Sequence, residues 1–164
     1  MFEATSLEVT LPTPIGVLAV RRSILIAAPP ERVWAEFTTF ERMKRWFGVG
    51  HKLVAYEPRV GGIVETDASG VPEGHEGEAL RFRGRVVTFE PNHEVTFEQD
   101  WLGHGWVAPP YVTIRLTPAL GGTLVELFHH TIERVGPSAA EDHAGFEGGW
   151  DTRHLLALRT IVEA

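Results

Sequence analysis

Two histidines are the residues best suited to acid–base chemistry. His129 has the same strand parity as Val125 and Leu127, which predicts that its side chain faces inward. His154 follows Trp150 by four residues, which predicts that both lie on the buried side of a C-terminal helix. A neutral imidazole in an apolar pocket can act as a general base near neutral pH. No carboxylate that would orient either ring is identifiable, so both are weak catalytic candidates and a non-catalytic role is favoured.

The histidines give little support for a metal centre. No H-x-x-x-H pair occurs, and His143 and His154 are eleven residues apart. On one helix this spacing corresponds to about 16 Å, which is too far for one ion. A site built from His129, His154 and a strand carboxylate is the alternative. Cysteine is absent, and we find no phosphate loop, dinucleotide fingerprint or G-x-S-x-G motif. We expect no metal and no cofactor.

Large aromatic side chains are the most informative set, since the chain contains five tryptophans. They indicate either a pocket lined by flat apolar faces or a plain hydrophobic core. Trp34 and Phe37 fit the core. Other aromatic residues lie at a strand end, in a loop and in the glycine-rich half of a helix, where the mouth of a pocket is expected. The residues predicted to line a ligand site are Trp46, Phe47, Phe82, Phe97, Trp101, Trp106, His129, Phe146, Trp150 and His154.

One long C-terminal helix, residues 138–163, is predicted to position three of this set, Phe146, Trp150 and His154. Ser138 and Glu141 form an S-x-x-E capping box at its start. Its apolar arc is broad, which is typical of a helix lying in a groove. Gly145, Gly148 and Gly149 lower helix stability by about 1 kcal/mol each relative to alanine. They predict a kink, a mobile segment or a close backbone approach in the first half.

The rest of the chain reads as strands after a helical pair. A strand over 17–27 precedes two short helices, the first opened by Pro30 and the second by a Thr38–Glu41 capping box. Alternating apolar residues then predict about six antiparallel strands. Arginines 81, 83 and 85 form an outward row expected to face Glu98 and Asp100. A short strand within 7–11 and a polar loop over 68–78 complete the assignment. The resulting layout is α+β, with a curved sheet gripping the last helix.

Composition limits the partners and the compartment. A chain of 164 residues with 43% hydrophobic content is most simply one domain. Its net charge of −7 argues against nucleic acid as a partner. No apolar run approaches the roughly 20 residues of a membrane span. The first ten residues lack the basic and apolar regions of a signal peptide, so we expect a cytoplasmic protein.

Several motifs in order resemble the START-like (SRPBCC) superfamily, in the branch of homologues of the activator of heat shock protein 90 ATPase. They are APPERVW at 28–34, RWFG at 45–48, GRVV at 84–87, GGT at 121–123 and Gly149-Trp150. The resemblance covers residues 20–164 and leaves 1–19 as an N-terminal extension. It implies a helix-grip fold with six or seven strands and a cavity between the last helix and the sheet.

The resemblance leaves three functions open. We favour binding of a small apolar or amphipathic molecule, lipid-like or aromatic, in that cavity. A cyclase-like or hydrolase-like enzyme using a pocket histidine is the second alternative. A chaperone-cofactor module is the third, and it is weak because a lone domain lacks the second domain that such activators carry. A homodimer is a further expectation.

Overall fold

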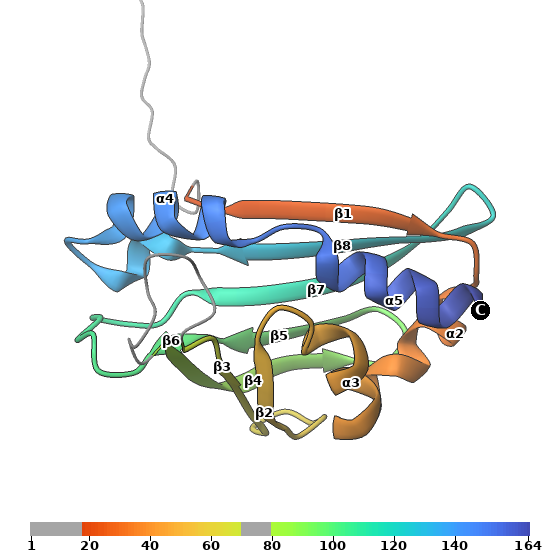
Figure 1. Ribbon diagram of the computed structural model, residues 1–164, viewed down its shortest axis with the longest axis horizontal. Helices are drawn as coiled ribbons and strands as arrows, with labels where there is room; N and C mark the ends of the chain where they lie inside the picture. The colour runs from red at the N-terminus through yellow and green to blue at the C-terminus, as the bar shows by residue number, and fades with distance from the viewer. Residues whose placement is uncertain (1–17, 70–79) are drawn as a thin grey trace, which may run out of the picture.

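A single curved antiparallel sheet forms the body of the molecule (Figure 1). The computed structural model describes residues 18–69 and 80–164. The predicted short strand within 7–11, most of the extension and most of the 68–78 loop lie outside these ranges. The strand order is β1-β8-β7-β5-β4-β3-β2, and β6 pairs with β4. The strands are β1 (Val20–Ile26), β2 (Lys52–Tyr56), β3 (Ile63–Asp67), β4 (Arg81–Glu90), β5 (Glu94–Glu98), β6 (Asp100–Trp101), β7 (Tyr111–Ala119) and β8 (Gly122–His130).

Two short helices follow β1, as predicted. They are α2 (Pro30–Trp34), which continues into a 3-10 turn (Ala35–Phe37), and α3 (Phe40–Phe47). The N-cap of α3 lies one residue later than expected, because Thr39 rather than Thr38 accepts a hydrogen bond from the Arg42 amide. Trp34 and Phe37 stack with ring centroids 4.9 Å apart and are buried, which confirms them as core.

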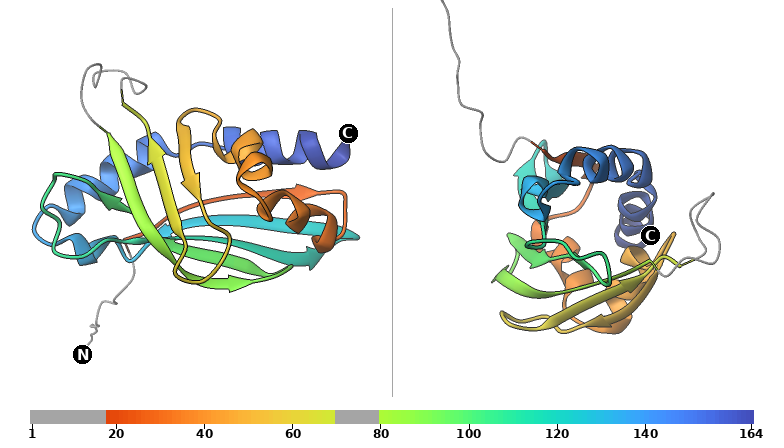
Figure 2. Two further views of the ribbon diagram at one scale, coloured as in Figure 1. Left: turned by 90° about the horizontal axis from the view of Figure 1, so that it is seen from below. Right: turned by 90° about the vertical axis from the view of Figure 1, so that its left-hand side faces the viewer.

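The C-terminal segment forms two helices instead of the single one predicted. After a 3-10 turn (Ile132–Val135), α4 (Ala139–Gly149) and α5 (Arg153–Glu163) are separated by a linker of residues 150–152. Trp150 is extended, with φ −80° and ψ 132°, which ends α4. Both helices lie on the concave side of the curled sheet (Figure 2). The helix-grip layout is therefore confirmed, while the unbroken helix is wrong.

The start of α4 also differs from the predicted capping box. The Ser138 hydroxyl donates to Asp142 instead of accepting from a backbone amide. The three glycines all lie inside the uninterrupted α4, and the break comes after them, at residues 150–152, so neither a kink at the glycines nor a close backbone approach is found. A Cβ atom added at Gly145, Gly148 or Gly149 would have no neighbouring atom within 4 Å. Nothing in the described structure therefore requires glycine at these positions.

We predict that these glycines keep α4 the less stable of the two C-terminal helices. The double variant Gly145→Ala with Gly148→Ala should stabilise α4 by up to about 1 kcal/mol per site, because alanine loses less backbone entropy. Hydrogen exchange should be faster in 139–149 than in 150–162, and the double variant should slow it. Ala144→Gly, at an exposed position of the same helix, should have the opposite effect. Equal, strong protection of both helices in the native chain would contradict this prediction.

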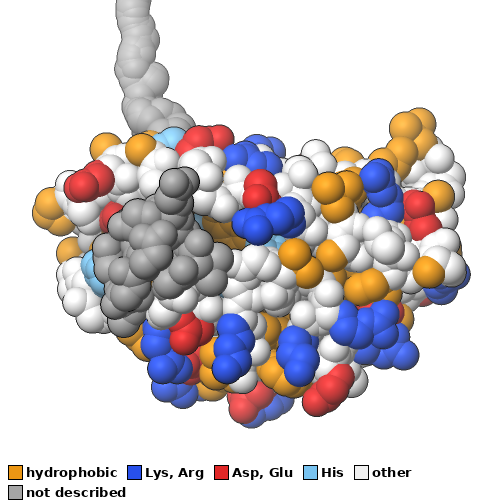
Figure 3. Space-filling model, viewed as in Figure 1, with side chains coloured by type: hydrophobic (Ala, Val, Ile, Leu, Met, Phe, Trp, Pro, Cys, Tyr) orange, Lys and Arg blue, Asp and Glu red, His pale blue; other side chains and the backbone are white. Residues whose placement is uncertain are grey.

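The arginine row on β4 is exposed, as predicted, but its partner differs. Arg81 and Arg83 both pair with Glu65 on the neighbouring strand β3, instead of with Glu98 or Asp100. Strand pairing places two carboxylates directly opposite Arg83, Glu65 on β3 and Asp100 on β6, and the ion pair is with Glu65. Lys and Arg side chains gather along the corresponding edge of the space-filling view (Figure 3).

Candidate functional site

The α5 half of the groove is a filled core. Four residues of α5 are buried: His154, Leu155, Leu158 and Val162. Trp46, Phe47 and Phe97, predicted to line the ligand site, are at most 1% exposed. The Trp46 indole donates to the Glu36 carbonyl oxygen at 3.1 Å, so its polar group is already satisfied within the core.

The α4 half is packed differently, because α4 has no buried residue. Phe146 is the centre of its inward side. Its ring centroid is 4.3 Å from His129, 6.2 Å from Phe82 and 6.1 Å from Trp106. Trp101 lies 5.7 Å from Phe82 and 6.0 Å from Trp106. We call these four half-buried rings, Phe82, Trp101, Trp106 and Phe146, the α4 cluster. Hydrophobic atoms are recessed below the α4–α5 linker in Figure 3.

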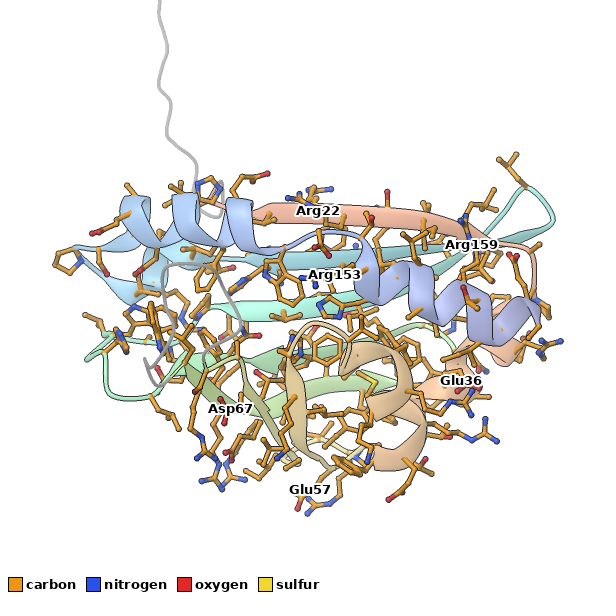
Figure 4. The ribbon with its side chains drawn as sticks, viewed as in Figure 1. Arg22, Glu36, Glu57, Asp67, Arg153 and Arg159 are labelled. Atoms are coloured by element: carbon orange, nitrogen blue, oxygen red, sulfur yellow. The ribbon has the colours of Figure 1, made fainter. Side chains whose placement is uncertain are left out.

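Trp150 holds the linker to the sheet and to the end of α4 through three of its groups. Its indole Nε1 donates to His129 Nδ1 at 2.9 Å, and its amide donates to the Phe146 carbonyl at 2.9 Å. Its carbonyl accepts from Arg22 Nε and Nη2 on β1 at 3.2 and 3.0 Å. Arg22 also donates to the Glu147 carbonyl, so a cation stabilises the C-terminal end of α4. Figure 4 labels Arg22 beside this linker and Arg153 where α5 begins.

His129 faces inward and is completely buried, as its strand parity predicted. His130 lies on the other face, where its Nε2 is 2.9 Å from the Thr113 hydroxyl. Burial lowers the pKa of His129 to about 3, with smaller contributions from His130 and His143. The ring is therefore neutral at pH 7. Because Nδ1 accepts from an indole, which can only donate, the ring proton is on Nε2.

His51 is a site residue that the sequence analysis missed. Its ring centroid lies 4.9 Å from that of His154, and Phe47 contacts both rings. Burial, followed by His154 and Arg153, lowers the pKa of His51 to about 3. Burial also lowers the pKa of His154, an effect partly offset by a hydrogen bond with the Trp46 backbone. His51 lies in the short connection between α3 and β2, which has no periodicity that could have revealed its direction.

Four buried ring nitrogens near the groove have no hydrogen-bond partner in the described structure. They are His51 Nε2, Trp101 Nε1, His129 Nε2 and His154 Nδ1. The His51 and His154 nitrogens lie in the α5 half and the other two in the α4 half. Buried polar groups are normally paired, so unpaired ones indicate a place for a bound molecule or for water. Within residues 18–69 and 80–164, no group of three or more His, Asp or Glu side chains is placed to hold a metal ion.

A separate hollow of about 590 Å³ lies on the outer face of the sheet. It was not anticipated, because the sequence analysis placed a cavity only between the helix and the sheet. Phe128 at its floor lies between Arg21 and Arg115, whose guanidinium carbons are 4.5 and 5.3 Å from the ring centroid. Arg115 is also paired with Glu94 at 3.0 Å. The cations of this hollow are thus already partnered.

Comparison with solved structures supports the fold. Protein CV1439 from Chromobacterium violaceum is 23% identical, with a TM-score of 0.64 over 89% of this chain and 98% of that one. The Aha1 dimer from Colwellia psychrerythraea is 18% identical, with a TM-score of 0.55 over 88% and 96% of the two chains. DynU16, a putative protein of the dynemicin biosynthetic locus, is 23% identical, with a TM-score of 0.60 over 89% of this chain and 47% of that one.

Of the helices that the structure describes, none has the length and apolarity needed to cross a bilayer.

Two further comparisons concern the sequence itself. No curated protein matches the chain. A family model matches residues 27–163, which is most of the chain and agrees with the motif order found in the sequence. The chain therefore belongs to the family described as activator of Hsp90 ATPase homolog 1-like protein.

Proposed function

We propose that the chain binds a small apolar or amphipathic molecule between α4 and the sheet. The observation that carries this proposal is the difference between the two C-terminal helices. α5 buries four residues against the core, whereas α4 buries none and covers aromatic rings that remain half-exposed. Half-exposed aromatic side chains beneath a loosely packed helix favour a ligand site over a plain core.

The helix break supports a route into this site. The linker separates α4 from the well-packed α5, so α4 can move without disturbing the core below α5. Its glycines lower the cost of that movement, and the hydrogen bonds of Trp150 and Arg22 define the closed position. Helices that cover a ligand site are drawn from the less stable parts of a fold.

The enzyme alternative receives less support from the same geometry. The lone pair of His129 Nδ1 is occupied by the Trp150 indole, and Nε2 carries the proton. A ring in this state can donate a hydrogen bond but cannot accept a substrate proton. Its pKa of about 3 is also far below that of an effective base at pH 7. These properties favour binding over base catalysis by His129.

Binding can be tested with the uncharged fluorescent probe N-phenyl-1-naphthylamine. We expect the folded chain to bind it with increased emission, and Phe146→Ala to weaken binding about tenfold by removing the central ring of the α4 cluster. Leu156→Ala is the matched control, because Leu156 is exposed on α5 and should leave the affinity unchanged. Native mass spectrometry of protein purified from its source would show whether a small molecule is retained. No probe binding to the folded chain would contradict the proposed function.

A further inference from the structure

The α4 half of the groove presents two N–H groups with nothing to bind. An indole nitrogen only donates, so Trp101 Nε1 is a donor, and it is buried and unpaired. His129 Nε2 is the second donor, because Trp150 occupies the other nitrogen of the ring. The two donors lie at either side of Phe82 and Phe146, within the chain of ring contacts of the α4 cluster.

Trp150 determines which atom His129 offers. If its indole were absent, the neutral ring could carry its proton on either nitrogen and present either a donor or an acceptor. Because the indole N–H donates to Nδ1 at 2.9 Å, Nδ1 must carry a lone pair. The proton of the neutral ring is therefore on Nε2. The complete burial of His129 makes an unpaired Nε2–H costly until an acceptor reaches it.

Three charged side chains near the α4 cluster, Asp142, Arg22 and Glu147, already have partners. Asp142 accepts from the Trp106 indole at 3.0 Å and from the Ser138 hydroxyl at 2.7 Å. Arg22 donates to the carbonyls at the end of α4 and pairs with Glu147. A ligand with a full charge at this position would have to displace one of these contacts.

We propose that the ligand is an uncharged, planar aromatic molecule with a carbonyl or equivalent acceptor oxygen, received by His129 Nε2–H with Trp101 Nε1–H as a second donor. This inference rests on the proposed function and specifies the chemistry of the ligand. The flat rings of Phe82, Trp106 and Phe146 supply stacking and edge contacts for the aromatic part. The oxygen satisfies a donor that the apolar surroundings otherwise leave unpaired.

Three naphthalenes of matched shape test this inference by titration calorimetry. The ketone 2-acetylnaphthalene and the alkene 2-isopropenylnaphthalene differ only in an oxygen in place of a methylene group, and 2-naphthoate adds a charge. We expect the ketone to bind about tenfold more tightly than the alkene, because the alkene leaves His129 Nε2–H unpaired. The naphthoate should bind more weakly than the ketone.

Variants assign the preference to particular atoms. His129→Phe should remove most of the difference between ketone and alkene while leaving alkene affinity within about twofold. Trp150→Phe should reduce the difference too, since it releases the tautomer of His129. If His129→Phe does not fold by circular dichroism, Trp101→Phe and Trp150→Phe carry the test, and an unchanged ketone preference in both overturns the inference.

The outcomes separate the inference from the proposed function. Equal binding of ketone and alkene to the native chain overturns the acceptor requirement but leaves a ligand site in the groove. Tighter binding of the naphthoate overturns the uncharged character of the ligand. If none of the three probes binds, the proposed function itself fails, and the inference fails with it.

Discussion

Acidification from pH 7 to pH 5 should lower the free energy of unfolding by about 4 kcal/mol. His51 and His129 have pKa values of about 3 in the folded chain and near 6.5 when unfolded. Below pH 6.5 the unfolded chain therefore binds more protons, and stability falls as the pH falls towards 3. Each histidine contributes about 1.4 kcal/mol per pH unit in this window, or roughly 2 kcal/mol at pH 5. His154, whose pKa is also lowered, acts in the same direction.

Urea unfolding at pH 7, 6 and 5 measures this effect. His129→Gln should flatten the profile by removing one buried titrating ring, and His51→Gln should remove the contribution of the ring beside His154 and Arg153. His93→Gln is the control, since it makes the same substitution at an exposed histidine in the turn between β4 and β5. Constant stability between pH 7 and pH 5 would show that these rings are not held neutral by burial.

Trp150→Ala should lower the free energy of unfolding by about 3 kcal/mol. The substitution removes ring contacts with Phe47 and His154 and the hydrogen bond to His129. It also leaves His129 with both nitrogens unpaired in a buried position, which adds a desolvation cost. Because Trp150 fixes the linker, residues 139–149 should exchange their amide hydrogens faster than in the native chain.

The variant Trp150→Phe separates the two contributions. It keeps a smaller aromatic ring in place and loses the indole N–H with part of the ring area, so we expect a loss of about 1–2 kcal/mol, less than for alanine. Urea unfolding gives the free energies, and exchange measured by mass spectrometry gives the local effect on α4. If the free energy of unfolding of Trp150→Ala is within about 0.5 kcal/mol of that of the native chain, the linker is not stabilised by this side chain.

The alternation of apolar residues was sufficient to predict most of the sheet. It placed His129 inward, because successive side chains of a strand point to opposite faces, and the structure accordingly has its neighbour His130 on the outer face. Helical spacing was less informative at the C-terminus. His143 and His154 share a face on an unbroken helical wheel, but the extended Trp150 ends that wheel. His143 instead approaches the Ala19 carbonyl at 3.0 Å, beside β1.

The remaining features of the site depend on tertiary contacts that leave no local pattern. The approach of His51 to His154 requires the packing of α3 against α5. The proton position on His129 depends on Trp150, which lies 21 residues further along the chain. The pairing of Arg81 and Arg83 with Glu65 depends on a strand order that several antiparallel arrangements could have satisfied. Local spacing therefore identified the elements and many of the rings, but not the directions of their polar atoms.

The open surroundings of the α4 glycines make this helix a natural attachment point for a reporter. The chain contains no cysteine, so Gly148→Cys would provide a single thiol for labelling. A Cβ atom added at this position meets no atom within 4 Å, so the thiol can be introduced there without a clash with the described structure. An environment-sensitive fluorophore there would report each movement of α4 in real time. Under the proposed function, binding of the ligand between α4 and the sheet would then be read as an optical signal.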